Sequence, residues 1–276
     1  NQTLERIKQS DVSERARTIA SRSGLVFAWA GDIDAQEATA LSDQVRSALP
    51  EGPSFVDSTP DPTPLPGHRL VLVDKPERTQ TQILIGGLGT HPRDADHTAL
   101  LVGNTIFGGT FTARLTQEVR SKRGWSYGAY SSLPIDRRRQ AFSLWTFPKA
   151  DDAAACIRLE LDMLRALHAD GVTKKELAWA KRYLVRSHAF AVDTASKRVG
   201  LALDTWLLDL PPSYYDEYLA RISAVTLDEV NAALHQRLSL DNLLIAVVGT
   251  AADLRSAIEA SIGDLVQSEV VPYDAD

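Results

Sequence analysis

Cysteine, basic charge and long apolar runs are all scarce in this 276-residue sequence. The single cysteine, Cys156, excludes an intrachain disulfide and therefore a disulfide-stabilised scaffold. Acidic residues outnumber basic ones, 36 to 30, so the chain lacks the basic field that nucleic acid or an anionic membrane requires. No stretch approaches the roughly 20 apolar residues of a membrane-spanning helix. Because 44% of the residues are hydrophobic, the chain can still bury a full core.

One pattern occurs twice in the chain. LVFAWAG, ending at Gly31, and LLIAVVG, ending at Gly249, are apolar runs that predict strands, each followed by a short polar turn and an amphipathic helix. Upstream of them, TLERIKQ from Thr3 and TLDEVNAALHQ from Thr226 both predict a capped helix. This spacing indicates two tandem domains of roughly 200 residues. We expect residues 1–52 to be the remnant of the first domain, most of which is missing from the chain.

A segment rich in Pro, Ser, Thr and Asp follows this first copy. Because it lacks apolar periodicity, we interpret residues 53–67 as a linker and residues 68–276 as the second domain. The alternative is a long surface loop within one domain.

The second domain alternates hairpin-like strand pairs with helices. This order predicts an α+β fold, with a mostly antiparallel sheet covered by helices. We expect strands within 68–76, 78–89, 125–136, 138–149 and 242–249, and helices within 94–107, 112–124, 151–169, 173–209, 213–237 with a break near Thr226, and 251–264. The Cys156 thiol falls on the apolar stripe of one of these helices, which favours a buried structural role.

The stretch NTIFGGTFTARLTQEVRSKRGWSYGAYSS resembles the second-half signature of the pitrilysin or insulinase-type zinc metallopeptidases. The positions that match that signature are Asn104, Gly108, Gly109, Arg114, Leu115, Glu118, Arg120, Gly124 and Tyr127. The sequence departs from it at Trp125, Thr110 and Ala113. Similarity to the family extends over essentially the whole chain.

The resemblance implies that the zinc site lies elsewhere. Family members bind zinc through an H-x-x-E-H helix in their first half, where the spacing brings both imidazoles to one helix face. This chain has no such motif, so we expect no metal ligands in it and zinc in the missing N-terminal half or a partner chain. Its histidines are predicted to be surface or partly packed imidazoles: His68, His91, His97, His168, His188 and His235.

Arg120 and Tyr127 are the residues to which the resemblance assigns substrate or transition-state contacts. A guanidinium and a phenol fixed near an attacked peptide bond can stabilise the negative charge that develops on its oxygen. Without the resemblance, Arg120 could simply pair with Glu118 and Tyr127 could pack on the sheet.

The resemblance therefore predicts the inactive, substrate-contacting half of a zinc metalloendopeptidase, which is not proteolytic by itself. Its expected partners are a zinc-binding half or subunit and a peptide substrate, with a homo- or heterodimer possible and no nucleic acid or membrane span. The alternatives are a non-catalytic structural subunit and a peptide-binding module that adds a substrate strand to a sheet edge. The compartment stays open, with a lean towards the bacterial periplasm from the resemblance.

Overall fold

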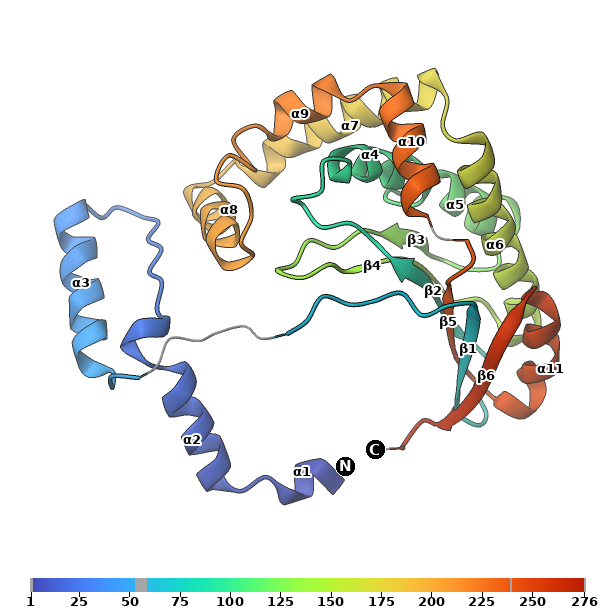
Figure 1. Ribbon diagram of the computed structural model, residues 1–276, viewed down its shortest axis with the longest axis horizontal. Coiled ribbons are helices and arrows are strands. Elements are labelled where there is room, and N and C mark those ends of the chain that lie inside the picture. The colour runs from blue at the N-terminus through green and yellow to red at the C-terminus, as the bar shows by residue number, and fades with distance from the viewer. Residues whose placement is uncertain (1, 53–58, 239, 276) are drawn as a thin grey trace.

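A computed structural model describes residues 2–52, 59–238 and 240–275 of the chain (Figure 1). Residues from His68 onwards build a sheet with helices packed against it, whereas the N-terminal helices lie apart from that sheet. The predicted α+β fold is confirmed.

The sheet has six strands in the order β3-β4-β2-β5-β1-β6. Their bounds are β1 His68–Asp74, β2 Gln82–Leu88, β3 Ala129–Ser132, β4 Ala141–Thr146, β5 Leu244–Gly249 and β6 Leu265–Pro272. The pairs β3–β4, β4–β2 and β2–β5 are antiparallel, while β1 is parallel to both β5 and β6. The sheet is thus mixed and mostly antiparallel, as expected.

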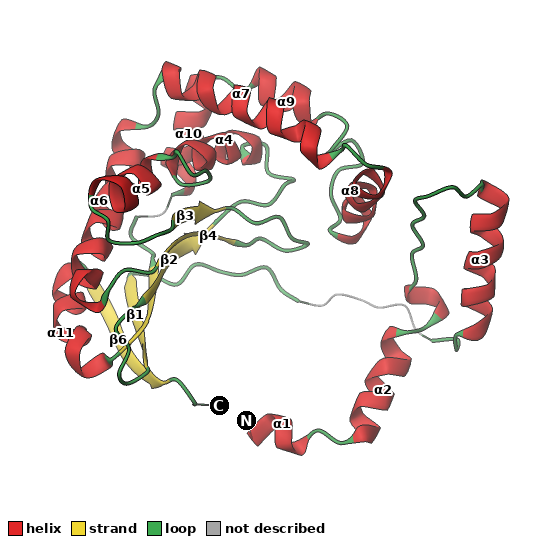
Figure 2. Ribbon diagram, turned by 180° about the vertical axis from the view of Figure 1, so that it is seen from behind, coloured by secondary structure: helices red, strands yellow, loops and turns green. Residues whose placement is uncertain are grey.

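Helices cover one face of this sheet (Figure 2). Their bounds are α4 His97–Phe107, α5 Arg114–Thr116, α6 Ala153–Asp170, α7 Lys174–Ala191, α8 Ala195–Leu207, α9 Tyr218–Ala224, α10 Leu227–Arg237 and α11 Ala251–Ser261. The helix expected over 173–209 is broken between α7 and α8, where Thr194 caps the new helix by accepting a hydrogen bond from the Lys197 N–H at 3.2 Å. The expected break at Thr226 is confirmed.

Strand alternation places the core between the sheet and the helices. Ile83 and Ile85 of β2 are fully buried, whereas Leu84 between them is 46% exposed on the opposite face. Trp145 of β4 lies beside Leu84 in the register and is also exposed. The face turned away from the helices is therefore apolar and open.

The N-terminal segment forms α1 Gln2–Arg6, α2 Gln9–Ile19 and α3 Ala35–Ala48. Two expectations about it are wrong. Residues 25–30 form no strand, because none of the strands in the described parts of the chain pairs with them. Thr3 does not cap a helix but lies inside α1, and the α-helix that directly precedes residues 25–30 is α2.

The last strand, β6, was missed by the sequence reasoning. It lies at the sheet edge and is mostly exposed, so its sequence LVQSEVVP carries little of the apolar alternation that marks a half-buried strand. The division into 1–52, 53–67 and 68–276 stays a prediction, and residues 53–58 of the expected linker lie outside the described residues.

Candidate functional site

Arg120 lies in a tightly anchored helical segment at the end of the helix layer. The segment begins at α5 and continues as a π-helical turn over Gln117–Lys122. Leu115 and Val119 are fully buried and fix it to the core. The chain then reverses at Gly124, whose φ of +66° suits a residue without a side chain, as expected.

Two aromatic rings contact the Arg120 guanidinium. Its central carbon lies 4.5 Å from the centre of the Tyr127 ring and 4.2 Å from that of Phe111. Both distances are within the range of cation–π attraction. The structure thus brings the two predicted residues together and adds Phe111, which the sequence reasoning missed although it lies in the matching stretch GGTF.

Arg120 does not form the ion pair that would give it a purely structural role. Glu118 binds Lys122 and, at 2.7 Å, Arg123, and these hydrogen bonds hold the pKa of the Glu118 carboxyl below its usual range. Within the described residues, Arg120 has no carboxylate partner, and its Nη1 atom is buried without a hydrogen-bond acceptor. A buried donor without an acceptor is costly unless a ligand supplies one.

Tyr127 is not packed on the sheet. Its side chain is 76% exposed, and it precedes β3, which begins only at Ala129. The strand expected over 125–136 therefore does not begin at Trp125. Instead, the buried Ser126 hydroxyl donates to the Gly128 carbonyl at 2.6 Å and accepts from the Phe147 N–H at 3.0 Å. This local turn replaces strand pairing and leaves the Tyr127 ring free to lie against Arg120.

No group of three or more His, Cys, Asp or Glu side chains that could hold a metal occurs in the described parts of the chain. The residues present do not fit zinc. The Cys156 thiol is fully buried, and burial raises its pKa, consistent with a structural role. The expectation of surface or partly packed histidines is wrong for two of them, His68 and His97, which are 6% and 1% exposed.

These two histidines are occupied by structural hydrogen bonds. The His68 ring nitrogens lie 2.7 and 2.6 Å from the carbonyl oxygens of Gly263 and Leu240. His97 lies between the hydroxyls of Thr90 and Tyr214, and burial lowers its pKa to about 4. Neither imidazole has a nitrogen available for a metal ion.

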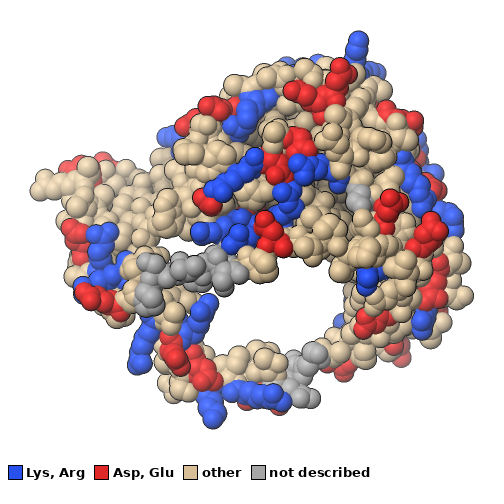
Figure 3. All heavy atoms as spheres, viewed as in Figure 1, with Lys and Arg blue, Asp and Glu red and all other residues tan. Residues whose placement is uncertain are grey.

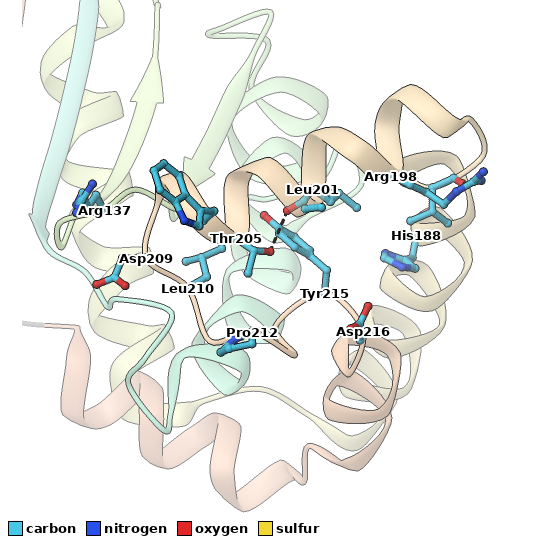
Figure 4. Close-up of a pocket in the computed structure, with 13 residues that line it drawn as sticks. Arg137, His188, Arg198, Leu201, Thr205, Asp209, Leu210, Pro212, Tyr215 and Asp216 are labelled. Carbon is cyan, nitrogen blue, oxygen red and sulfur yellow. Dashed lines mark hydrogen bonds between the residues drawn. The ribbon is translucent and has the colours of Figure 1, made fainter. Parts of the chain in front are cut away.

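A separate pocket of about 930 Å³ lies between α7, α8 and the loop that follows α8. Figure 4 shows Arg137 at one end and His188 with Arg198 at the other, with Asp209 and Asp216 also lining it. Charges of both signs line this pocket, and neither Arg120 nor Tyr127 does. It is therefore distinct from the predicted site.

Surface charge and helix composition bear on the expected partners. On the face seen in Figure 3, basic and acidic side chains are interspersed, without the continuous basic field that nucleic acid requires. Among the described helices, none combines the length and the apolar character needed to cross a membrane.

Comparisons with known proteins identify the family. Residues 3–184 match the family model described as the peptidase M16 inactive domain. A protein named an uncharacterized zinc protease from Mycobacterium tuberculosis is 30% identical over 222 residues, covering 78% of this chain and 49% of that protein. A protein named a non-peptidase homolog from Helicobacter pylori is 20% identical over 249 residues, 90% of this chain and 57% of that protein. The chain spans about half the length of the curated relatives it matches.

Solved structures agree with the sequence matches. A peptidase M16 inactive domain from Pseudomonas fluorescens superposes with a TM-score of 0.80 at 28% identity, over 90% of this chain and 59% of that one. A chain of Candida albicans complex III₂ shares the fold, with a TM-score of 0.70 at 13% identity over 94% of this chain and 64% of that one. The resemblance to pitrilysin and insulinase-type peptidases is thus confirmed, and this chain belongs to the peptidase M16 inactive-domain family.

Proposed function

We propose that this chain is the substrate-contacting, zinc-free half of a zinc metalloendopeptidase and does not cleave peptides by itself. Zinc is held, in this proposal, by an N-terminal half or partner subunit. The observation that carries the proposal is the Arg120 guanidinium, which is held between aromatic side chains yet retains a buried donor without an acceptor.

Arg120 and Tyr127 offer two kinds of hydrogen-bond donor at one place. The guanidinium stays charged at all working pH values and presents several N–H groups, and the Tyr127 phenol adds an O–H. A peptide carbonyl oxygen gains negative charge when water attacks its carbon, so donors already oriented towards that oxygen stabilise the transition state more than the substrate. The same two groups can also clamp the peptide backbone beside the reacting bond.

The test is to combine the 276-residue chain with a zinc-binding half and measure cleavage of a quenched fluorescent peptide. We expect neither half to cleave the peptide alone and the mixture to cleave it. Arg120→Ala should lower kcat/KM of the mixture by about tenfold or more. Zinc-dependent cleavage by this chain alone, or full activity of the Arg120→Ala mixture, would contradict the proposal.

A second candidate is a non-catalytic subunit of the same fold. The similarity to a protein named a non-peptidase homolog favours it. In that case the companion half would also lack H-x-x-E-H, and the assembly would bind no stoichiometric zinc. Metal analysis of the purified assembly therefore separates the two candidates.

The third alternative, a module that adds a peptide strand to a sheet edge, has little room at β3. The Ser131 N–H there already donates to the Gly108 carbonyl at 3.0 Å. The edge strand at the other side of the sheet, β6, lies five strands away from β3 in the sheet order. Strand addition at β6 would therefore leave Arg120 and Tyr127 without a part in binding.

A further inference from the structure

We propose that Phe111 is a positioning residue for Arg120: its ring orients the guanidinium towards the substrate without itself contacting the reacting atoms. This inference rests on the proposed function of Arg120. It assigns a role to a residue that the sequence analysis did not name as a site residue.

Phe111 does not serve the core. Its side chain is 57% exposed, yet its ring centre lies 4.2 Å from the central carbon of the Arg120 guanidinium, slightly closer than that of Tyr127. An exposed phenylalanine contributes little to stability by burial. Its effect is therefore concentrated on the cation that it touches.

The loop that carries Phe111 is pressed against β3. The Ser131 N–H donates to the Gly108 carbonyl at 3.0 Å, and the Ser131 hydroxyl donates to the Asn104 side-chain oxygen at 2.6 Å. A Cβ atom on Gly108 would lie 2.5 Å from the Ser131 nitrogen, so no larger residue fits there. Neither Gly108 nor Gly109 has a positive φ, so these glycines serve the close approach to β3 and not a left-handed helix end.

One hydroxyl lies where the Phe111 loop, the Arg120 helix and the start of β3 meet. Thr116 precedes Arg120 by one helical turn, and its Oγ1 lies 3.2 Å from the Thr110 carbonyl oxygen and 2.7 Å from that of Ala129. Thr110 is the neighbour of Phe111, and Ala129 follows Tyr127 by two residues. The backbone on each side of the guanidinium is therefore fixed to the same turn.

The two rings limit the rotation of the Arg120 side chain without consuming its strong donors. A free arginine loses rotamer entropy when a ligand fixes it, and a side chain already held in place loses less. Ring faces attract the cation but are poor hydrogen-bond acceptors, so the N–H groups of the guanidinium are not consumed by these contacts and stay available for a carbonyl oxygen. Phe111 therefore pre-orients the donor that the substrate meets.

The experiment is a double-mutant cycle in the assembly of this chain with a zinc-binding half, assayed with a quenched fluorescent peptide that the wild-type assembly cleaves. Phe111→Ala should lower kcat/KM about threefold to tenfold, while Phe111→Tyr, which keeps a ring, should stay within about twofold. In the Arg120→Ala background, Phe111→Ala should have no further effect. Phe190→Ala, which removes a phenylalanine that is 71% exposed on α7, is the matched control and should leave kcat/KM unchanged.

A second measurement needs no activity. In the ¹⁵N-labelled 276-residue chain, ring currents should shift the Arg120 side-chain N–H resonance upfield, and Phe111→Ala should move that resonance towards the position of exposed arginines without changing the melting temperature by more than a few degrees. If Arg120→Ala itself has no effect on cleavage, the proposed function fails. If Arg120→Ala lowers kcat/KM but Phe111→Ala does not, only the positioning role is overturned. The same holds if Phe111→Ala lowers kcat/KM by the same factor in the Arg120→Ala background as in the wild type.

Discussion

The Arg120 guanidinium carbon lies 4.5 Å from the centre of the Tyr127 ring, although the Tyr127 side chain is itself 76% exposed. The Tyr127 ring thus contacts the Arg120 cation and is not part of the hydrophobic core. In the proposed function, Tyr127 has two separable roles: its ring holds Arg120, and its hydroxyl would donate a hydrogen bond to the substrate. The first prediction separates them.

Tyr127→Phe keeps the ring and removes only the hydroxyl. If the hydroxyl acts on the transition state, this change should lower kcat of the assembled peptidase by about tenfold with little change in KM. Tyr127→Ala removes the ring as well and should lower kcat by about a further threefold. Steady-state kinetics with one peptide checks both values. Equal activity of Tyr127→Phe and the wild type would leave the ring as the only functional part of this side chain.

Glu160 of α6 should destabilise the fold at neutral and alkaline pH. It is fully buried, and neither carboxyl oxygen has a hydrogen-bond partner of good geometry. Burial raises its pKa to about 8, and the nearby Thr146 hydroxyl offsets this only in part. The folded chain therefore keeps this proton between about pH 4.5 and 8, whereas the unfolded chain releases it, so stability falls as the pH rises through that window and levels off above it.

Glu160→Gln removes the ionisable group at nearly constant shape. We expect it to raise the free energy of unfolding on the order of 2 kcal/mol at pH 8 and above, with the gain shrinking towards pH 4.5. Urea unfolding across this pH range measures the gain, with Glu14→Gln on the exposed side of α2 as the control. A gain that is constant with pH would show that ionisation of Glu160 is not the cause.

The Arg114–Glu176 ion pair should lock α5 to α7. The guanidinium donates two hydrogen bonds of 2.7 Å to the carboxylate, and these bonds, more than any other cause, lower the pKa of Glu176 to about 2. Because the folded pKa is depressed, the stabilisation is fully present above about pH 4.5 and is lost as the pH falls through 2.

A double-mutant cycle with Arg114→Met and Glu176→Gln measures this pair. We expect a coupling energy of about 1 kcal/mol at pH 7, since the bidentate geometry is favourable but the side chains are still 30% and 28% exposed. Glu176 also accepts a hydrogen bond of 2.8 Å from the Thr173 N–H at the start of α7. Substituting Glu176 alone should therefore lower the free energy of unfolding more than substituting Arg114 alone. Coupling that persists unchanged at pH 2 would contradict this assignment.

Residues 1–52 should be dispensable for folding of the sheet domain. Large apolar side chains in this segment are exposed, namely Leu4, Ile7, Val12, Ile19, Val26, Trp29, Leu41 and Val45. A chain from Thr59 to Asp276 should therefore keep its melting temperature within about 3 °C and bind less of a hydrophobic dye. A large loss of stability would mean that the two parts pack together, and the division near residues 53–67 would be wrong.

The strongly periodic elements could be predicted because burial imposes their pattern. The alternation of apolar residues that includes Ile83 and Ile85 predicts the buried face of β2, and the capping box at Thr226 predicts the start of α10. Local signals failed where partners are absent or the strand is at an edge: residues 25–30 have nothing to pair with, and β6 is too exposed to show a pattern.

The sequence by itself determined the α+β class, the family and the pairing of Arg120 with Tyr127, because these depend on local periodicity and on a spacing of residue types along the chain. Only the tertiary structure decided that Glu118 binds Lys122 and Arg123 and leaves Arg120 without a carboxylate, and that Phe111 reaches the same guanidinium. These contacts depend on how the loop between α4 and α5 packs against β3. Close packing at Gly108 and the hydrogen bonds of Thr116 and Ser131 fix that packing. Such long-range contacts leave no periodic pattern in the sequence.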